Sequence, residues 1–248
     1  MPRTQRLDYW LNALQSALWP VTEFTGFEDF SVELEEASLG AISTCAERIC
    51  AHRARRTRRD VENTAQSTFH LFMSLQQSWS LVTANGDVRL RQGDVVLAGD
   101  GQHETCVDEG FHGIILKCPV SWVQTWLPDP DQLAGRAIRR ESRWGEVLSP
   151  MVSQLTPQLA AAAPLPHQVL TDQLGAILSL IAGQAERDAP QASLRKIRSC
   201  IRERCNESEL TADDVAVALN IPPAILHQTL AASNLTFAGE LSRARRTR

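Results

Sequence analysis

The chain has 248 residues and a net charge of −4, with 43% hydrophobic and 22% charged residues, which is ordinary for one or two globular domains. It contains no run of about 18 apolar residues, and its N-terminus lacks the apolar core of a secretory signal, so neither a membrane span nor export is expected and the cytoplasm is favoured. Six cysteines without a C-x-x-C pair fit no zinc framework, so reduced, partly buried thiols are expected, with no metal and no cofactor.

The charge is unevenly distributed. From Arg195 to Arg248 nine Lys or Arg oppose six Asp or Glu, a net of +3, whereas the preceding residues carry −7. An acidic body followed by a basic tail indicates that the two ends of the chain have different roles.

The N-terminal half predicts mainly strands. A short amphipathic helix ends at Pro20, and from about 27 to 118 short apolar segments alternate with turn signals such as Asn85-Gly86 and Gln92-Gly93-Asp94. Asn-Gly supplies the positive φ angles of a tight hairpin. Such a pattern favours a β-sandwich or barrel. The densest charge run, His52 to Arg59, favours a solvated loop or edge strand over a nucleic-acid patch.

Beyond Pro119 the pattern becomes helical, with helices expected over about 140–187. One of them carries four apolar residues at spacings of 4, 3 and 4: Leu170, Leu174, Ile177 and Ile181. A stripe this short serves either packing on its own domain or a dimer contact, and both alternatives stay open. The sequence Asp188-Ala189-Pro190-Gln191 then predicts a linker over 188–193, which separates residues 1–187 from residues 194–248.

The segment from Glu209 to Phe237 predicts two short helices. Thr211 and Asp214 have the spacing of an N-terminal capping box, and Asn220 lies where the first helix needs a left-handed residue to end. Pro222 and Pro223 can open the next helix. Two short helices around a tight turn make a helix-turn-helix, with Ile225, Leu226 and Leu230 facing inward. The residues expected to face a DNA groove are Pro223, Ala224, His227 and Gln228.

These motifs resemble the AraC/XylS family of transcription regulators. The family's C-terminal signature is matched in order by Leu210, Val215-Ala216, Asn220-Ile221, Leu226, Thr236-Phe237 and the arginine-rich segment from Arg243 to Arg246. Its effector-binding domain has a glycine-aspartate turn followed by an apolar strand, which resembles Gln92-Gly93-Asp94-Val95-Val96-Leu97. A later tryptophan- and leucine-rich exit segment resembles Ile115 to Leu127.

The resemblance implies an α+β chain with a cupin-like β-barrel over about 27–118, flanking helices, and an all-α DNA-binding region over 194–248. It implies a small-molecule effector in residues 1–187, promoter DNA as a partner, a homodimer, and RNA polymerase as a further candidate partner. DNA contacts would include Arg243, Arg245 and Arg246. The effector would contact either the strand face with His70 and Phe72 or the residues Phe69, Leu71 and Met73, with Trp79 and His103 as further candidates, because a one-residue slip reverses the faces. Effector, operator and sign of regulation stay open.

Three departures from the family pattern matter. First, Pro222 replaces the usual serine and Ala224 and Gln228 replace the usual arginines, so no Lys or Arg lies between Pro223 and Ser233 and weak DNA binding by this helix is expected. Second, Asn234 replaces a glycine. Third, the sequence ends inside what resembles the family's linker helix, so a second helix-turn-helix unit is expected to be missing. The alternative function is therefore a dimerising, ligand-binding module without tight DNA binding. An enzyme is not expected, because no His-x-His pair and no nucleophile motif occurs.

Overall fold

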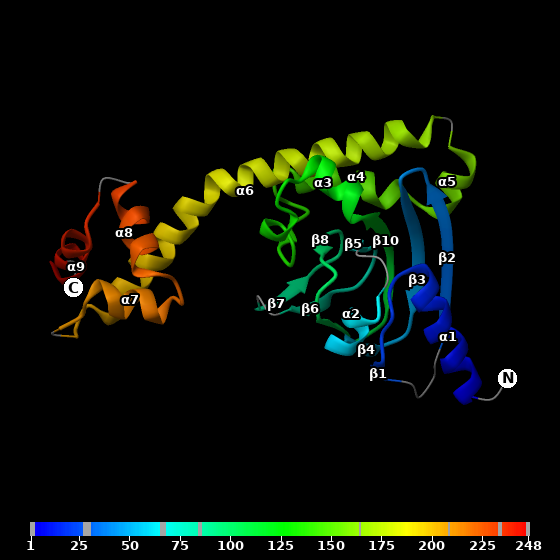
Figure 1. Ribbon diagram of the computed structural model, residues 1–248, viewed down its shortest axis with the longest axis horizontal. Coiled ribbons are helices and arrows are strands. Elements are labelled where there is room, and N and C mark those ends of the chain that lie inside the picture. Colours follow the sequence, from blue (N-terminus) through cyan, green and yellow to red (C-terminus); the bar gives the residue numbers. More distant parts are fainter. Residues whose placement is uncertain are drawn as a thin grey trace. The chain divides into compact units, whose positions relative to one another are not determined.

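The computed structural model describes residues 3–26, 31–64, 68–83, 86–163, 165–207, 209–232 and 235–246. The chain divides into two compact units, Met1–Ala182 and Gly183–Arg248 (Figure 1). Each unit has its own hydrophobic core. No helix within the described ranges is long and apolar enough to cross a membrane.

The strands of the first unit form two antiparallel sheets (Figure 1). One sheet contains, in spatial order, β1 (Glu23–Thr25), β4 (His52–Arg56), β9 (His103–Val107), β6 (Trp79–Thr83) and β7 (Gly86–Leu90). The other contains β11 (Ala137–Ile138), β8 (Val95–Ala98), β5 (Thr68–Ser74), β10 (Phe111–Pro119), β3 (Ile42–Ile49) and β2 (Val32–Leu39). The expected α+β class is confirmed. The expected closed barrel is not seen, because within the described strands no hydrogen-bonded ladder joins the two sheets. Asn85 of the predicted hairpin turn lies outside the described residues, whereas Gly86 has the positive φ of +117°.

Helices surround these sheets and form the second unit. The first unit contains α1 (Arg3–Ala17), α2 (Arg58–Glu62), α3 (Val120–Trp126), the 3-10 turn η1 (Pro130–Gln132), α4 (Gly145–Gln154) and α5 (Pro157–Ala162). The long helix α6 (His167–Arg204) begins in the first unit and ends in the second. The second unit continues with α7 (Ala212–Ala218), α8 (Pro223–Ala231) and α9 (Phe237–Arg246).

The six-stranded sheet has a core on each of its faces. Phe69, Leu71 and Met73 of β5 pack in one core with residues of α4 and α6, while Phe72 packs in another with residues of the five-stranded sheet. Figure 1 shows α4 and α6 along the outer face of this sheet. All seven residues of β5 are buried because both of its faces are covered. The space between the two sheets is therefore lined by the strand face that carries His70 and Phe72.

The apolar stripe of α6 packs on its own domain. Leu174 and Ile181 are buried, and Leu170 and Ile177 are partly buried against the same helix-side core. Gly175 lets α6 approach Trp126 closely, since a Cβ atom there would lie 2.3 Å from the indole ring. Leu174 and Ile181 therefore support the packing alternative, while a dimer contact through this stripe, whose Leu170 and Ile177 are partly exposed, stays a prediction.

The linker expected at 188–193 is also corrected. Helix α6 runs through these residues, and the division between units falls between Ala182 and Gly183. Ala, Gln, Glu, Leu and Arg residues dominate the sequence around Pro190, and these are strong helix formers.

The predicted Gln92-Gly93-Asp94 turn is confirmed, and its aspartate is a structural anchor. Gly93 has a φ of +79°, and Asp94 is fully buried. The Asp94 carboxylate accepts hydrogen bonds from the backbone N–H groups of Arg91 (3.0 Å) and Arg140 (2.9 Å), and it pairs with the Arg139 guanidinium at 2.6 Å. Burial alone would raise the pKa of Asp94, but these donors outweigh burial and lower it.

Asp94→Asn is expected to lower the free energy of unfolding by about 2–3 kcal/mol, because an amide cannot satisfy three donors and leaves Arg139 without its counter-ion. Urea denaturation measures the loss. Asp108→Asn is the matched control, since Asp108 forms an exposed pair with Arg89 at 3.2 Å and should cost less than about 1 kcal/mol. Equal losses in the two variants would contradict the anchoring role of Asp94.

Candidate functional site

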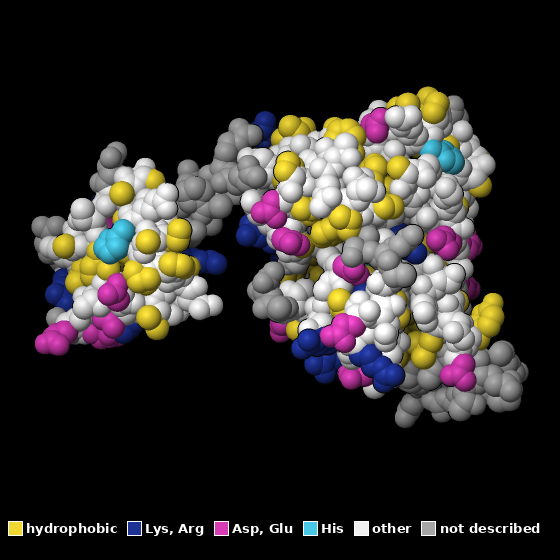
Figure 2. Space-filling view, in the orientation of Figure 1, with side chains coloured by type: hydrophobic (Ala, Val, Ile, Leu, Met, Phe, Trp, Pro, Cys, Tyr) yellow, Lys and Arg dark blue, Asp and Glu magenta, His cyan; other side chains and the backbone are white. Residues whose placement is uncertain are grey.

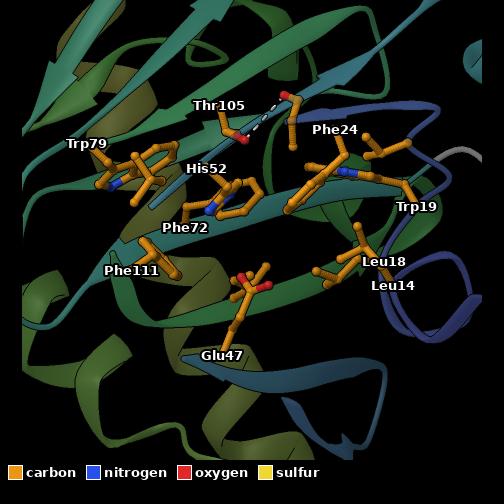
Figure 3. Close-up of a pocket in the computed structure, with 14 residues that line it drawn as sticks. Leu14, Leu18, Trp19, Phe24, Glu47, His52, Phe72, Trp79, Thr105 and Phe111 are labelled. Carbon is orange, nitrogen blue, oxygen red and sulfur yellow. Dashed lines mark hydrogen bonds between the residues drawn. The ribbon is translucent and has the colours of Figure 1, made fainter. Parts of the chain in front are cut away.

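A small cavity lies between the two sheets (Figure 3). Its volume is about 50 Å³, and most of its lining is apolar or aromatic. The rings come from both sheets and from the N-terminal segment: Trp19, Phe24, Phe72, Trp79 and Phe111. Helix α1 contributes Leu14, and Leu18 follows that helix directly, so the N-terminal segment forms one wall of the cavity.

The residues predicted to contact an effector divide between two places. Trp79 lines the cavity, as does Phe72 of the alternative strand face. Phe69, Leu71 and Met73 lie in the helix-side core and do not line this cavity, because side chains alternate between the two faces of a strand. His70 is fully buried beside Trp19, with ring centroids 3.8 Å apart.

His103 is placed differently from Trp79. Its ring lies 4.5 Å from the Trp19 ring, and its Nδ1 is 3.0 Å from the carbonyl oxygen of Gly101. It lines a second hollow of about 220 Å³, whose other lining residues include Gly99 and Asp131. His103 is therefore not part of the lining of the inter-sheet cavity.

Glu47 is one of the cavity residues that the sequence analysis did not identify. Its side chain extends from β3 toward His52 and Phe72 (Figure 3). It is only 8% exposed, and among the described residues no hydrogen bond or ion pair reaches its carboxylate. Burial raises its pKa from 4.5 to about 7. The alternation of β3 places residues 45, 47 and 49 on one face, which was the available signal, but an acidic residue in a strand is usually exposed.

Three further polar side chains line the cavity. The His52 ring stacks on Phe24 with centroids 5.0 Å apart, and its Nδ1 lies 2.9 Å from the Cys50 carbonyl oxygen. Burial lowers the pKa of His52, so the ring is neutral near pH 7. The Trp79 Nε1–H is buried without an acceptor, and the Thr105 hydroxyl donates to the Ala54 carbonyl at 3.3 Å. Among the described residues, the Glu47 carboxyl therefore lines the cavity without a protein partner, while the Trp79 N–H is buried.

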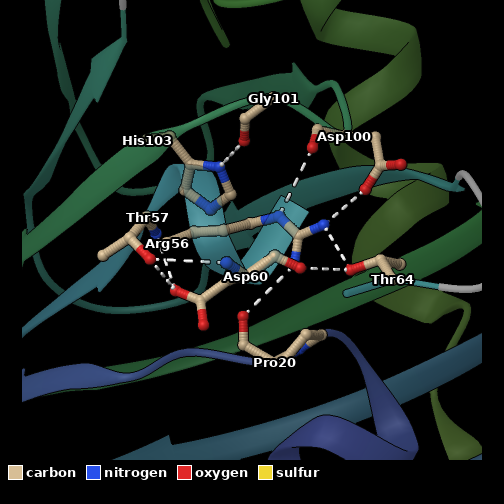
Figure 4. A network of polar contacts seen from close by, with 8 residues as sticks. All are labelled: Pro20, Arg56, Thr57, Asp60, Thr64, Asp100, Gly101 and His103. Atoms are coloured by element: carbon tan, nitrogen blue, oxygen red, sulfur yellow. Dashed lines mark hydrogen bonds and ion pairs between the residues drawn. The ribbon is translucent and has the colours of Figure 1, made fainter. Parts of the chain in front are cut away.

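A buried arginine holds the N-terminal segment in place (Figure 4). Arg56 is 1% exposed, and its guanidinium donates to Asp100 (2.7 Å), to the Thr64 hydroxyl (2.8 Å) and to the Pro20 carbonyl (3.2 Å). Asp60 adds a hydrogen bond from the Thr22 hydroxyl at 3.0 Å. These contacts fix the segment that follows α1, and with it one wall of the cavity.

This network also corrects the prediction for the charge run from His52 to Arg59. The run forms β4 and the start of α2, and β4 lies between β1 and β9. Side chains alternate along β4, so His52, Ala54 and Arg56 point inward. Only the outward-facing arginines of the strand are solvated as expected.

The second candidate surface is the helix pair α7–α8. The capping box is confirmed, since the Asp214 carboxylate accepts from the Thr211 backbone N–H at 2.9 Å, and Asn220 has the expected left-handed φ of 53°. Val215, Ala216, Leu226 and Leu230 are buried in the core of this unit. Pro223, Ala224, His227 and Gln228 are exposed. Ile225 is 46% exposed, so its predicted inward orientation is wrong, because Leu226 occupies the inward position of that turn.

Several arginines of the second unit form ion pairs or hydrogen bonds with other residues of that unit. Arg198 pairs with Glu240 at 2.7 Å, and Arg204 pairs with Glu207 at 2.7 Å. Arg245 donates to the backbone carbonyls of Cys205 (2.9 Å) and Glu207 (2.7 Å). Arg243 is exposed and lies 3.9 Å from Glu240, while the Arg246 side chain lies outside the described residues. In Figure 2 the face of this unit that is drawn carries hydrophobic and acidic side chains, with isolated Lys and Arg at its margins.

Comparison with known proteins bears first on the N-terminal unit. Residues 10–181 match the family described as the AraC-binding-like domain. The crystal structure of the AraC-like transcriptional activator CuxR has a TM-score of 0.58 and 15% identity, and the match covers 97% of this chain and 89% of that one. The cupin domain of an XRE family transcriptional regulator from Enterobacter cloacae has a TM-score of only 0.30 and 10% identity, covering 37% of this chain and 97% of that one. No curated protein matches the sequence.

Proposed function

Because the chain belongs to the family of AraC-binding-like domains, we propose that it is a transcription regulator that senses a small molecule and binds promoter DNA. In this proposal the first unit holds the effector and α7–α8 is a helix-turn-helix. The observation that carries the DNA-binding part is the helix pair itself, whose left-handed Asn220 turn and buried inner face leave one side of α8 open to solvent. No catalytic role is assigned.

The exposed side of α8 has the chemistry of a base-reading surface. In a helix-turn-helix the N-terminal part of the second helix enters the major groove. His227 and Gln228 are exposed there, and glutamine can bind adenine through two hydrogen bonds. Pro223 and Ala224 are small and apolar, so they would allow close approach and could contact a thymine methyl group.

The charges of this unit indicate weak affinity for DNA. Arg198, Arg204 and Arg245 are already bound to acidic or carbonyl groups of the same unit. Among the residues whose side chains the structure describes, Lys196, Arg202 and Arg243 are exposed cations of this unit, and Arg243 already lies 3.9 Å from Glu240. Three phosphate contacts from these side chains would give a slope of about −3 for log K against log salt, which is shallow for a specific DNA-binding protein. Homodimerisation, which doubles the contacts, is part of the proposal, as are a contact with RNA polymerase and a cytoplasmic location.

Selection of binding sites from random DNA with the full chain tests the DNA-binding part. The expected result is an enriched sequence, with Gln228→Ala weakening its binding by roughly tenfold or more through loss of a bidentate base contact. Gln173→Ala is the matched control, because Gln173 is exposed on α6 in the first unit. Enrichment that Gln228→Ala and His227→Ala leave unchanged would overturn the assignment of α8.

The second candidate function is a ligand-binding module without tight DNA binding. The contacts of Arg198, Arg204 and Arg245 within the second unit favour this alternative, since these arginines would have to break existing hydrogen bonds or ion pairs to reach phosphates. This alternative expects ligand binding by the first unit and no enriched DNA sequence at ordinary salt. The same selection experiment, run with and without a bound ligand, separates the two functions.

A further inference from the structure

The buried carboxyl of Glu47 limits what chemistry the cavity can accept. We propose that the cavity between the two sheets binds a small organic ammonium ion, with the charged nitrogen at Glu47 and the carbon chain among the surrounding rings. This inference rests on the proposed sensing function and specifies the class of effector. It is carried by a carboxyl group that is more than nine-tenths buried, lines the cavity and has no protein partner in the described part of the chain.

The first argument is charge. Burying an ionised carboxylate is costly unless a cation or hydrogen-bond donors face it. No Lys or Arg is among the described residues that line the cavity, and His52 is the only other ionisable group on its wall. Because burial lowers the pKa of His52, that ring supplies no positive charge near neutral pH. A ligand that carries its own positive charge would complete the ion pair.

The second argument is the aromatic lining. The rings of Trp19, Phe24, Phe72, Trp79 and Phe111 surround the same space as Glu47 (Figure 3). Aromatic faces attract cations, and organic ammonium groups are recognised in proteins by cages of such rings. One face of Trp19 is already near the Arg56 guanidinium at 5.9 Å, and Phe24 stacks on His52 with ring centroids 5.0 Å apart. An anionic ligand would meet Glu47 without any compensating cation.

The third argument is size. The cavity of about 50 Å³ is much smaller than the roughly 150 Å³ apolar cavity that admits benzene. A molecule of only a few heavy atoms fits without movement of the walls.

Other ionisable groups near Glu47 do not change this expectation. Cys45 lies on the same face of β3, and burial raises the pKa of its thiol to about 12, so it stays protonated. The residues that α1, β5 and β10 contribute to the cavity wall are uncharged. Glu47 is therefore the group whose ionisation should control binding between pH 6 and pH 8, since its pKa lies near 7.

Three probes of similar size test the proposal on the full chain: n-propylammonium, 1-propanol and propionate, each at millimolar concentration. Binding is followed by the NMR signal of the Trp79 indole N–H. n-Propylammonium is expected to bind roughly tenfold more tightly at pH 8 than at pH 6, because the ionised fraction of Glu47 rises about tenfold over that range. Propionate is expected not to bind. Glu47→Gln should weaken n-propylammonium binding at least tenfold and leave 1-propanol binding unchanged, while Glu109→Gln, an exposed carboxylate, should change neither.

The outcomes separate this inference from the broader function. Equal or tighter binding of 1-propanol than of n-propylammonium would overturn the ammonium assignment and leave a small-molecule site. Tighter binding at pH 6 would also overturn it, because a protonated Glu47 would then donate to a neutral ligand. Failure of all three probes to shift the Trp79 signal would reject this cavity as the ligand site. The DNA-binding proposal would be unaffected, because the selection of binding sites from random DNA tests it separately.

Discussion

Arg56→Met is expected to lower the free energy of unfolding by about 3–5 kcal/mol, because it removes a buried cation and leaves several acceptors without donors. The Arg56 guanidinium binds Asp100, Thr64 and the Pro20 carbonyl, and its side chain is fully buried. Methionine is similar in length but supplies none of these hydrogen bonds. Because Pro20 lies between α1 and β1, detachment of the N-terminal segment should accompany the loss of stability. Urea denaturation measures the first effect, and hydrogen exchange over residues 8–22 measures the second.

The neighbouring strand position supplies the control. Arg55 lies on the outer side of β4, where it forms an exposed pair with Glu23 at 3.5 Å. Arg55→Met is expected to cost less than about 1 kcal/mol, because solvent screens that pair. Similar losses for Arg55→Met and Arg56→Met would show that the buried network contributes little, contrary to the structure.

Glu47→Gln is expected to stabilise the protein at pH 8 by up to about 3 kcal/mol and to have little effect at pH 5. The pKa of Glu47 is raised from 4.5 to about 7 by burial, so the folded state binds a proton more readily than the unfolded state does. The protonated carboxyl therefore contributes fully to the free energy of unfolding below pH 4.5, and this contribution is lost as the pH rises through 7. Glutamine is neutral throughout, so the variant escapes this loss.

Urea denaturation at pH 5 and pH 8 measures the difference between the variant and the natural protein. The exposed Glu109→Gln should show the same small change at both pH values, which controls for general effects of charge. A pH-independent difference for Glu47→Gln would contradict the raised pKa. Addition of n-propylammonium at pH 8 should recover part of the stability of the natural protein and have no effect on Glu47→Gln, which links this prediction to the proposed ligand.

The amino-acid sequence alone determined the features that depend on nearby residues. The Thr211–Asp214 capping box, the left-handed Asn220 and the turn at Gly93 each follow from residues a few positions apart, and all three are confirmed. The family assignment is confirmed as well, by the match over residues 10–181. These features can be predicted because they depend on backbone geometry and short-range hydrogen bonds, not on the segment that packs against them.

Tertiary packing alone decided which side chains face the cavity. Strand β5 is buried on both faces, so its sequence has no polar alternation to reveal that Phe72, rather than Leu71, faces the other sheet. Arg56 is buried and Arg55 exposed within one arginine-rich run, and Glu47 faces an apolar space although it is acidic. The burial of a side chain depends on what a distant segment places opposite it, and that information is not contained in the neighbouring residues.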